Sequence, residues 1–158
     1  MNDINKGRVS RRRLFEWAAA LGALMTLPAR ARATGSRPET AFNATALDQA
    51  LGALGETPIR HEGVIFTTPD IAENGAVVPI RVEVDQALLP NVSKVSVLVE
   101  MNPNPLVAVF DIAPCTEVYI ETRVKVAQTG NLYAVVESDG QLFMASRETK
   151  VTLGGCGG

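Results

Sequence analysis

Apolar and polar residues alternate along most of the chain from residue 59 onward. This period of two is the pattern of a β-strand that buries one face. The alternation is clearest in segments 78–85, 95–101 and 118–126, and further strands are predicted at 64–67, 106–112, 132–137 and 142–151. About seven strands at intervals of roughly ten residues, without helices between them, predict an all-β fold, an immunoglobulin-like antiparallel β-sandwich. A small barrel is the main alternative.

One short helix is predicted ahead of the strands. Leu47, Ala50, Leu51 and Leu54 follow helical spacing within residues 44–54. Asn43 is the expected N-cap and Gly55 the expected end of the helix. The chain therefore divides into a linker with one short helix at 34–58, a β-sandwich at 59–153 and a C-terminal arm at 154–158. Residues 1–33 have a different character.

Residues 1–33 have the features of an export signal. A basic region that includes Arg11-Arg12-Arg13 precedes an apolar stretch of about a dozen residues at 17–27, which is too short to span a bilayer comfortably. Ala31-Arg32-Ala33 then provides a small-x-small cleavage site. The segment Ser10–Phe15 resembles a twin-arginine signal, with an ordinary secretory signal as the alternative. Both predict a periplasmic protein that begins at Thr34.

Removal of residues 1–33 leaves an acidic protein. The mature chain keeps 8 lysine and arginine residues against 15 aspartate and glutamate residues, a net charge of −7. This charge argues against nucleic acid and anionic membranes as partners, and it favours cationic protein partners.

The C-terminus, Gly154-Gly155-Cys156-Gly157-Gly158, carries the candidate chemistry. Glycine has no Cβ and loses the most conformational freedom on ordering, so we expect a thin, flexible arm. Cys156 lies three residues beyond Leu153, a reach of about 10 Å. Such an arm fits a narrow enzyme channel, and its thiol is the predicted site of covalent substrate attachment.

Cys156 has no neighbouring base in the sequence. A model thiol with a pKa of about 8.5 is only a few per cent thiolate at pH 7, so activation has to come from another protein. We therefore predict a substrate carrier and not an enzyme, with no catalytic residue. Two alternatives remain: an exported immunoglobulin-like binding subunit without covalent substrate, and a diglycine carrier that holds sulfur as a thiocarboxylate on Gly158.

The remaining ligand-type residues give no metal-binding pattern. His61 is the one histidine, and Cys115 and Cys156 are widely separated. No metal or cofactor is predicted. Cys115 follows Pro114 at a strand boundary and is expected to be a buried or half-buried free thiol, with a Cys115–Cys156 disulfide as the alternative.

These motifs resemble those of the SoxY family, the sulfur-carrier subunits of the periplasmic thiosulfate-oxidising (Sox) multienzyme system. The terminal residues 154–158 are similar to that family's swinging arm. Ile71-Ala72-Glu73-Asn74-Gly75, leading to Val78-Pro79, and Asn102-Pro103-Asn104-Pro105 resemble its internal motifs, which we interpret as structural turns. Cys115 is not part of this pattern.

The resemblance implies a role and a set of partners. It implies a heterodimer with a second β-sandwich subunit, SoxZ. We expect this chain to bind that subunit through a partly apolar face that includes its own Leu98, Ala108 and Phe110. It further implies a haem-containing enzyme that couples thiosulfate to Cys156, a hydrolase that releases sulfate, and a sulfane dehydrogenase. Gly154, Gly155, Gly157 and Gly158 would give the arm flexibility and clearance.

Overall fold

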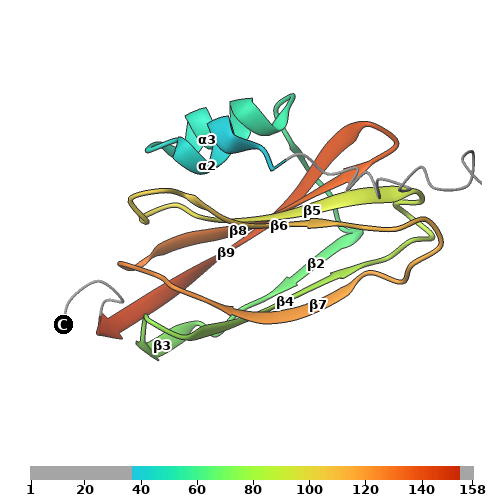
Figure 1. Ribbon diagram of the computed structural model, residues 1–158. Helices are drawn as coiled ribbons and strands as arrows, with labels where there is room; N and C mark the ends of the chain where they lie inside the picture. The colour runs from blue at the N-terminus through green and yellow to red at the C-terminus, as the bar shows by residue number, and fades with distance from the viewer. Residues whose placement is uncertain (1–36, 154–158) are drawn as a thin grey trace, which may run out of the picture. The chain divides into compact units, whose positions relative to one another are not determined.

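Residues 37–153, the part of the chain that the computed structural model describes, contain two helices and nine strands (Figure 1). The helices are α2 (Glu39–Asn43) and α3 (Leu47–Leu54). The strands are β1 (Ile59–Arg60), β2 (Val64–Thr67), β3 (Ile71–Asn74), β4 (Val78–Val84), β5 (Val92–Val99), β6 (Leu106–Asp111), β7 (Tyr119–Val124), β8 (Gly130–Ser138) and β9 (Gln141–Leu153).

The strands form two sheets that face each other. One sheet has the order β1-β9-β8-β5-β6, with β3 also paired to β9, and the other has the order β2-β4-β7. All seven predicted strands are present, and they pair with one another in antiparallel register. The two strands that were not predicted, β1 and β3, run parallel to β9 near its two ends. The all-β sandwich is confirmed.

The core between the sheets is built from the alternating apolar residues. On β4, Val78, Ile80 and Val82 point inward and are at most 2% exposed, while Pro79 and Arg81 point outward. The facing sheet supplies a matching set, which includes Val95, Val97, Val99, Leu132, Ala134 and Val136. Because each buried aliphatic side chain contributes about 1.5–3 kcal/mol, this core is the main source of stability.

The helices cover the other face of the larger sheet, as Figure 1 shows. Ala41 of α2 and Ala50 of α3 form a second apolar cluster with Leu98, which is fully buried. Ala108 and Phe110 point the opposite way and pack against the core between the sheets. The expectation that Leu98, Ala108 and Phe110 form one face for a partner is therefore wrong. The chain's own helices cover Leu98, while Ala108 and Phe110 are half-buried and belong to the other side of the sheet.

The helical segment differs from the prediction at its beginning. The structure has two helices, Asn43 is the last residue of α2, and the N-cap of α3 is Ala46, without a side-chain cap. Ala44 between them is extended, which lets both helices lay apolar residues on the sheet. The predicted end is correct: the Gly55 N–H donates to the Leu51 carbonyl, and a φ of 147° at Gly55 favours glycine.

Two polar segments form connections between strands. Asp139 and Gly140, both with positive φ, make the two-residue turn between β8 and β9. In the loop after β5, the Asn102 amide donates to the Lys125 carbonyl (2.8 Å) and accepts from the Ala127 N–H (2.9 Å). Asn104 donates to the Ala44 carbonyl and so joins the same loop to the helices.

Asn102→Ala is expected to destabilise the fold by about 1–2 kcal/mol, since it removes two hydrogen bonds that join two loops. Chemical denaturation of the two proteins measures the difference. Asn102→Asp is the matched control: it keeps the acceptor for the Ala127 N–H and loses the donor to Lys125, so its loss of stability should be intermediate. An alanine variant as stable as the parent would show that the loop is held by other contacts.

Candidate functional site

The predicted site residues Cys156, Gly154, Gly155, Gly157 and Gly158 lie outside the described residues. The structure does describe the strand that carries them. β9 contains thirteen residues against nine in its neighbour β8, and it ends at Leu153, directly before the glycine-rich segment. The end of β9 is therefore the described part of the chain that leads directly to the candidate site.

The end of β9 extends beyond β8. The last pair of the β8–β9 ladder is Gly130 with Thr149, so residues 150–153 have no strand beside them on that side. Thr129 takes its place, because its hydroxyl oxygen accepts a hydrogen bond from the Val151 N–H at 2.9 Å. A side chain thus satisfies a backbone donor that the shorter neighbour strand leaves unpaired.

On its other side, the end of β9 is paired with β3. The parallel register runs from Ile71 beside Lys150 to Asn74 beside Leu153, and the Lys150 N–H donates to the Asp70 carbonyl at 2.9 Å. The Thr152 hydroxyl adds a bond of 3.0 Å to the Glu73 carbonyl. β3 therefore holds the last residues of β9 in the sheet. β3 lies within the sequence motif at residues 71–75.

Thr149 anchors β9 immediately before this end. Its side chain is fully buried, and its hydroxyl donates to the Pro69 carbonyl at 3.0 Å and lies 2.9 Å from the Thr68 hydroxyl. A buried hydroxyl with both partners in place is costly to displace, so Thr149 fixes the register of β9. The last residues of β9, which precede the arm in the sequence, are thus held in place by neighbouring segments on both sides of the strand.

Sequence reasoning missed β3 and its contacts with Thr152. Ala72 is the only buried residue among the four of β3, and a single buried position gives no alternation to read. The motif at 71–75 was the available signal, but it was interpreted as a turn. The turn does follow: the Ala76 N–H donates to the side chain of Asn74.

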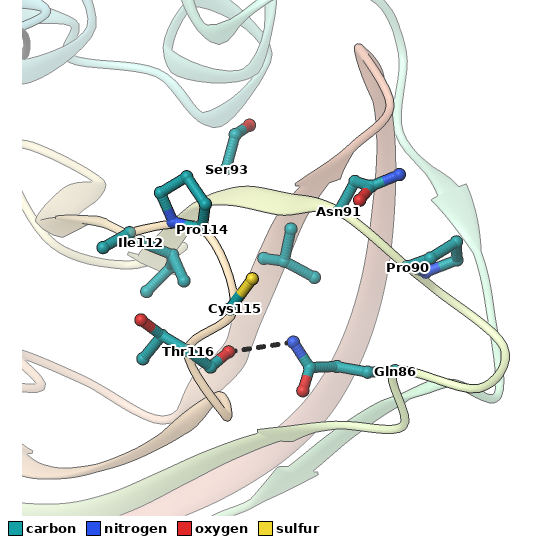
Figure 2. Close-up of a pocket in the computed structure, with 10 residues that line it drawn as sticks. Gln86, Pro90, Asn91, Ser93, Ile112, Pro114, Cys115 and Thr116 are labelled. Atoms are coloured by element: carbon teal, nitrogen blue, oxygen red, sulfur yellow. Dashed lines mark hydrogen bonds between the residues drawn. The ribbon is translucent and has the colours of Figure 1, made fainter.

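Cys115 is exposed, so the expectation of a buried or half-buried thiol is wrong. It lies in a turn closed by the Thr116 N–H and the Ala113 carbonyl, with a φ of 62°, and this turn keeps it outside the core. It lines an open pocket of about 470 Å³, together with Gln86 and Ser93. Figure 2 shows its sulfur pointing among the lining residues, beside the hydrogen bond from Gln86 to the Thr116 carbonyl.

This pocket lies at the opposite end of the sandwich from the end of β9. The Ile112 N–H donates to the Ser93 carbonyl, the Ser93 hydroxyl donates to the Glu137 carbonyl, and Glu137 pairs with Leu142, so these residues form one row across the sheet. Along β9, the distance from Leu142 to Leu153 is about 36 Å at about 3.3 Å per residue.

The distance argues against a Cys115–Cys156 disulfide within one chain. Cys115 is three residues beyond Ile112, and Cys156 is three residues beyond Leu153. Each connection spans about 10 Å at most, and disulfide-bonded Cα atoms lie within about 7 Å of each other. The sum, about 27 Å, is less than the distance along β9. Chain length therefore disfavours this pairing, and because Cys156 lies outside the described residues the disulfide alternative stays untested.

Two tyrosines have shifted acidities. Burial raises the pKa of Tyr133, and the negative charge of Glu100, which accepts a hydrogen bond from its hydroxyl, raises it further. A hydrogen bond to Glu121 raises the pKa of Tyr119. Both phenols stay protonated at neutral pH and act as donors, so neither is a base or a nucleophile.

Between residues 37 and 153, histidine, cysteine and acidic side chains nowhere form a group of three that could hold a metal ion. In the same range, neither helix is long and apolar enough to cross a membrane. The predicted absence of a metal and a cofactor in the whole chain stays a prediction.

The fold and the site define an immunoglobulin-like β-sandwich whose candidate reactive group follows the last strand in the sequence. Comparison with known proteins gives the family. The family model described as "Sulfur oxidation protein SoxY" matches residues 50–156. This match covers more than half of the chain and reaches Cys156, so the chain belongs to the SoxY family.

A solved structure agrees with this assignment. The sulfur carrier protein SoxY from Chlorobium limicola f thiosulfatophilum has 36% sequence identity to the chain and superimposes with a TM-score of 0.58. The similarity covers 67% of this chain and 94% of that one. The comparison with curated proteins found no match.

Proposed function

We propose that the chain is a covalent carrier of sulfur intermediates in thiosulfate oxidation and that Cys156 is the attachment site. The family match through residue 156 is the observation that carries the proposal. The solved relative is named a sulfur carrier protein, which supports the same role. The hydrogen bonds around β9 add that the strand is held up to the residue before the first glycine of the arm.

The proposed chemistry needs only a thiol from this chain. Thiosulfate and the Cys156 thiol form a sulfur–sulfur bond, which gives a cysteine S-thiosulfonate and releases one proton and two electrons. A haem-containing partner enzyme accepts the electrons. Water then cleaves the bond to the sulfone group in a hydrolase, which releases sulfate and leaves a persulfide on Cys156. A sulfane dehydrogenase would oxidise the remaining sulfur. The chain itself is a substrate and not a catalyst in each step.

The partners follow from the same proposal. A SoxZ-like β-sandwich subunit would form a heterodimer with this chain, and the carrier arm would visit the enzymes in turn. Because Leu98 is covered by α2 and α3, it is not available to the second subunit. We propose neither nucleic acid nor membrane as a partner. The acidic mature chain favours cationic protein surfaces instead.

Residues 1–33 lie outside the described residues, and we propose that they export the protein to the periplasm, by the twin-arginine route. The basic run at Arg11–Arg13 and the site at Ala31-Arg32-Ala33 support this. Export places Cys156 in the compartment where we expect its partner enzymes.

One measurement tests both the processing and the attachment. The intact mass of protein purified from periplasm should correspond to a chain that begins at Thr34 and should include sulfur adducts. Fragmentation should locate the adducts on Cys156, and a reducing agent should remove them. A chain that begins at Met1 would contradict export.

The same spectra separate the alternatives. A binding subunit without covalent substrate would show an unmodified chain after thiosulfate-dependent growth. A diglycine carrier would show sulfur in place of oxygen at the carboxyl group of Gly158, with Cys156 unmodified. Either result would contradict the proposed role of Cys156.

A further inference from the structure

The end of β9 is held by few contacts, and two of them are side-chain hydroxyls. Residues 150–153 have lost β8 as a neighbour and keep only the short strand β3. Thr129 accepts from the Val151 N–H on the β8 side, and Thr152 donates to the Glu73 carbonyl on the β3 side. These two bonds lie one residue apart in β9, on opposite sides of the strand.

We propose that Thr129 and Thr152 are positioning residues for the carrier reaction: they keep β9 ordered to Leu153 and so set the length of the arm. This inference rests on the proposed function of Cys156. With both bonds present, the tether between the sheet and Cys156 is three residues. Neither threonine contacts the reacting sulfur, and each acts through the backbone of β9.

Loss of the two bonds would lengthen the tether. If β9 were released back to Lys150, Cys156 would lie six positions beyond the sheet instead of three. The effective concentration of a tethered group falls roughly as the −3/2 power of tether length, so doubling the length lowers it about three-fold. The longer tether carries a cost in conformational entropy when the arm enters an enzyme, because the released residues must then be ordered again.

The buried hydroxyl of Thr149 limits how far the release can proceed. Its bond to the Pro69 carbonyl and its contact with the Thr68 hydroxyl hold the strand before Lys150. The change is therefore confined to the last residues of β9, and the sandwich itself is expected to stay folded when Thr129 and Thr152 are replaced.

The experiment compares loading kinetics of the full mature chain with its partner subunit. Thiosulfate and the haem-containing coupling enzyme are supplied, and the mass adduct on Cys156 is followed over time at a series of carrier concentrations. For the Thr129→Val/Thr152→Val double variant, we expect an apparent KM for the carrier that is about three-fold higher, with kcat unchanged. The corresponding serine variants keep the hydroxyls and should restore the parent KM.

Hydrogen exchange gives a readout that does not depend on sulfur chemistry. The amides of residues 150–153 should exchange faster in the valine variant, while those of β5 and β8 keep their rates. Thr67→Val, on the exposed side of β2, is the control for loss of a threonine hydroxyl. Gln86→Ala loses one hydrogen bond at the other end of the molecule and controls for a general loss of stability.

Each outcome decides one question. Unchanged exchange at 150–153, or an unchanged KM despite faster exchange, would overturn the inference, as would a lower kcat at constant KM. If the double variant does not fold, Thr152→Val, whose side chain is exposed, decides alone by the same criteria. If Cys156→Ser is loaded like the parent, the proposed function has failed, whatever the threonine variants do.

Discussion

Replacing Cys156 with serine is expected to abolish sulfur loading and thiosulfate-dependent sulfate release. On the proposed mechanism, the sulfur–sulfur bond can form only on this thiol, and a serine hydroxyl cannot form it. The stability of the variant should stay within about 0.5 kcal/mol of the parent, because residue 156 comes after the last strand in the sequence. Turnover with the partner enzymes and thermal unfolding measure the two effects.

Cys115→Ser is the matched control for this prediction. The Cys115 thiol is exposed and lies at the far end of the sandwich, so loading and stability should both be close to the parent values. If Cys156→Ser still releases sulfate from thiosulfate while Cys115→Ser does not, the carrier thiol has been assigned to the wrong cysteine.

The glycines of the arm give a finer test of the same proposal. Gly155→Val should leave Cys156 reactive toward a small alkylating reagent but slow its loading by the partner enzymes. The added side chain matters only if the arm threads a narrow channel. A valine variant with parent kinetics would keep Cys156 as the attachment site and remove the argument for threading.

The sandwich was predictable because strands such as β4 bury one face and expose the other. Val78, Ile80 and Val82 alternate with outward residues, and the structure places them in the core between the sheets. The short strands β1 and β3 were not predictable from this pattern, because two and four residues give too few alternating positions. They pair with the two ends of β9 along the edge opposite β8, where its backbone needs partners.

The glycine composition predicted where the arm begins. The geometry of the strand that precedes the arm was not predicted. Glycine content marks where regular structure should end, but it does not tell how the preceding strand is held. The contacts of Thr129 and Thr152 join residues 22 and 79 positions apart. Such pairs depend on the final topology, and no local pattern in the sequence encodes them.

The second face of β5 illustrates the same limit. Leu98 is apolar on the side away from the core between the sheets, and the sequence alone could not tell whether this chain or a partner covers it. The structure places Ala41, Ala50 and Leu142 in the same cluster, so the chain's own helices and β9 provide the cover.

Leu98→Ala is therefore expected to destabilise the chain by about 2–5 kcal/mol, the range for removing a fully buried leucine side chain. Leu88→Ala is the matched control: Leu88 is 46% exposed, and its loss should cost about 0.5 kcal/mol or less. Denaturant unfolding of the chain without its partner subunit measures both values. If a partner covered Leu98, the result would be the reverse, with an isolated chain of parent stability and weakened binding of the second subunit. A large loss of stability in the isolated chain, with partner binding retained in the fraction that is folded, would show that α2 and α3 close this face and that the heterodimer uses another.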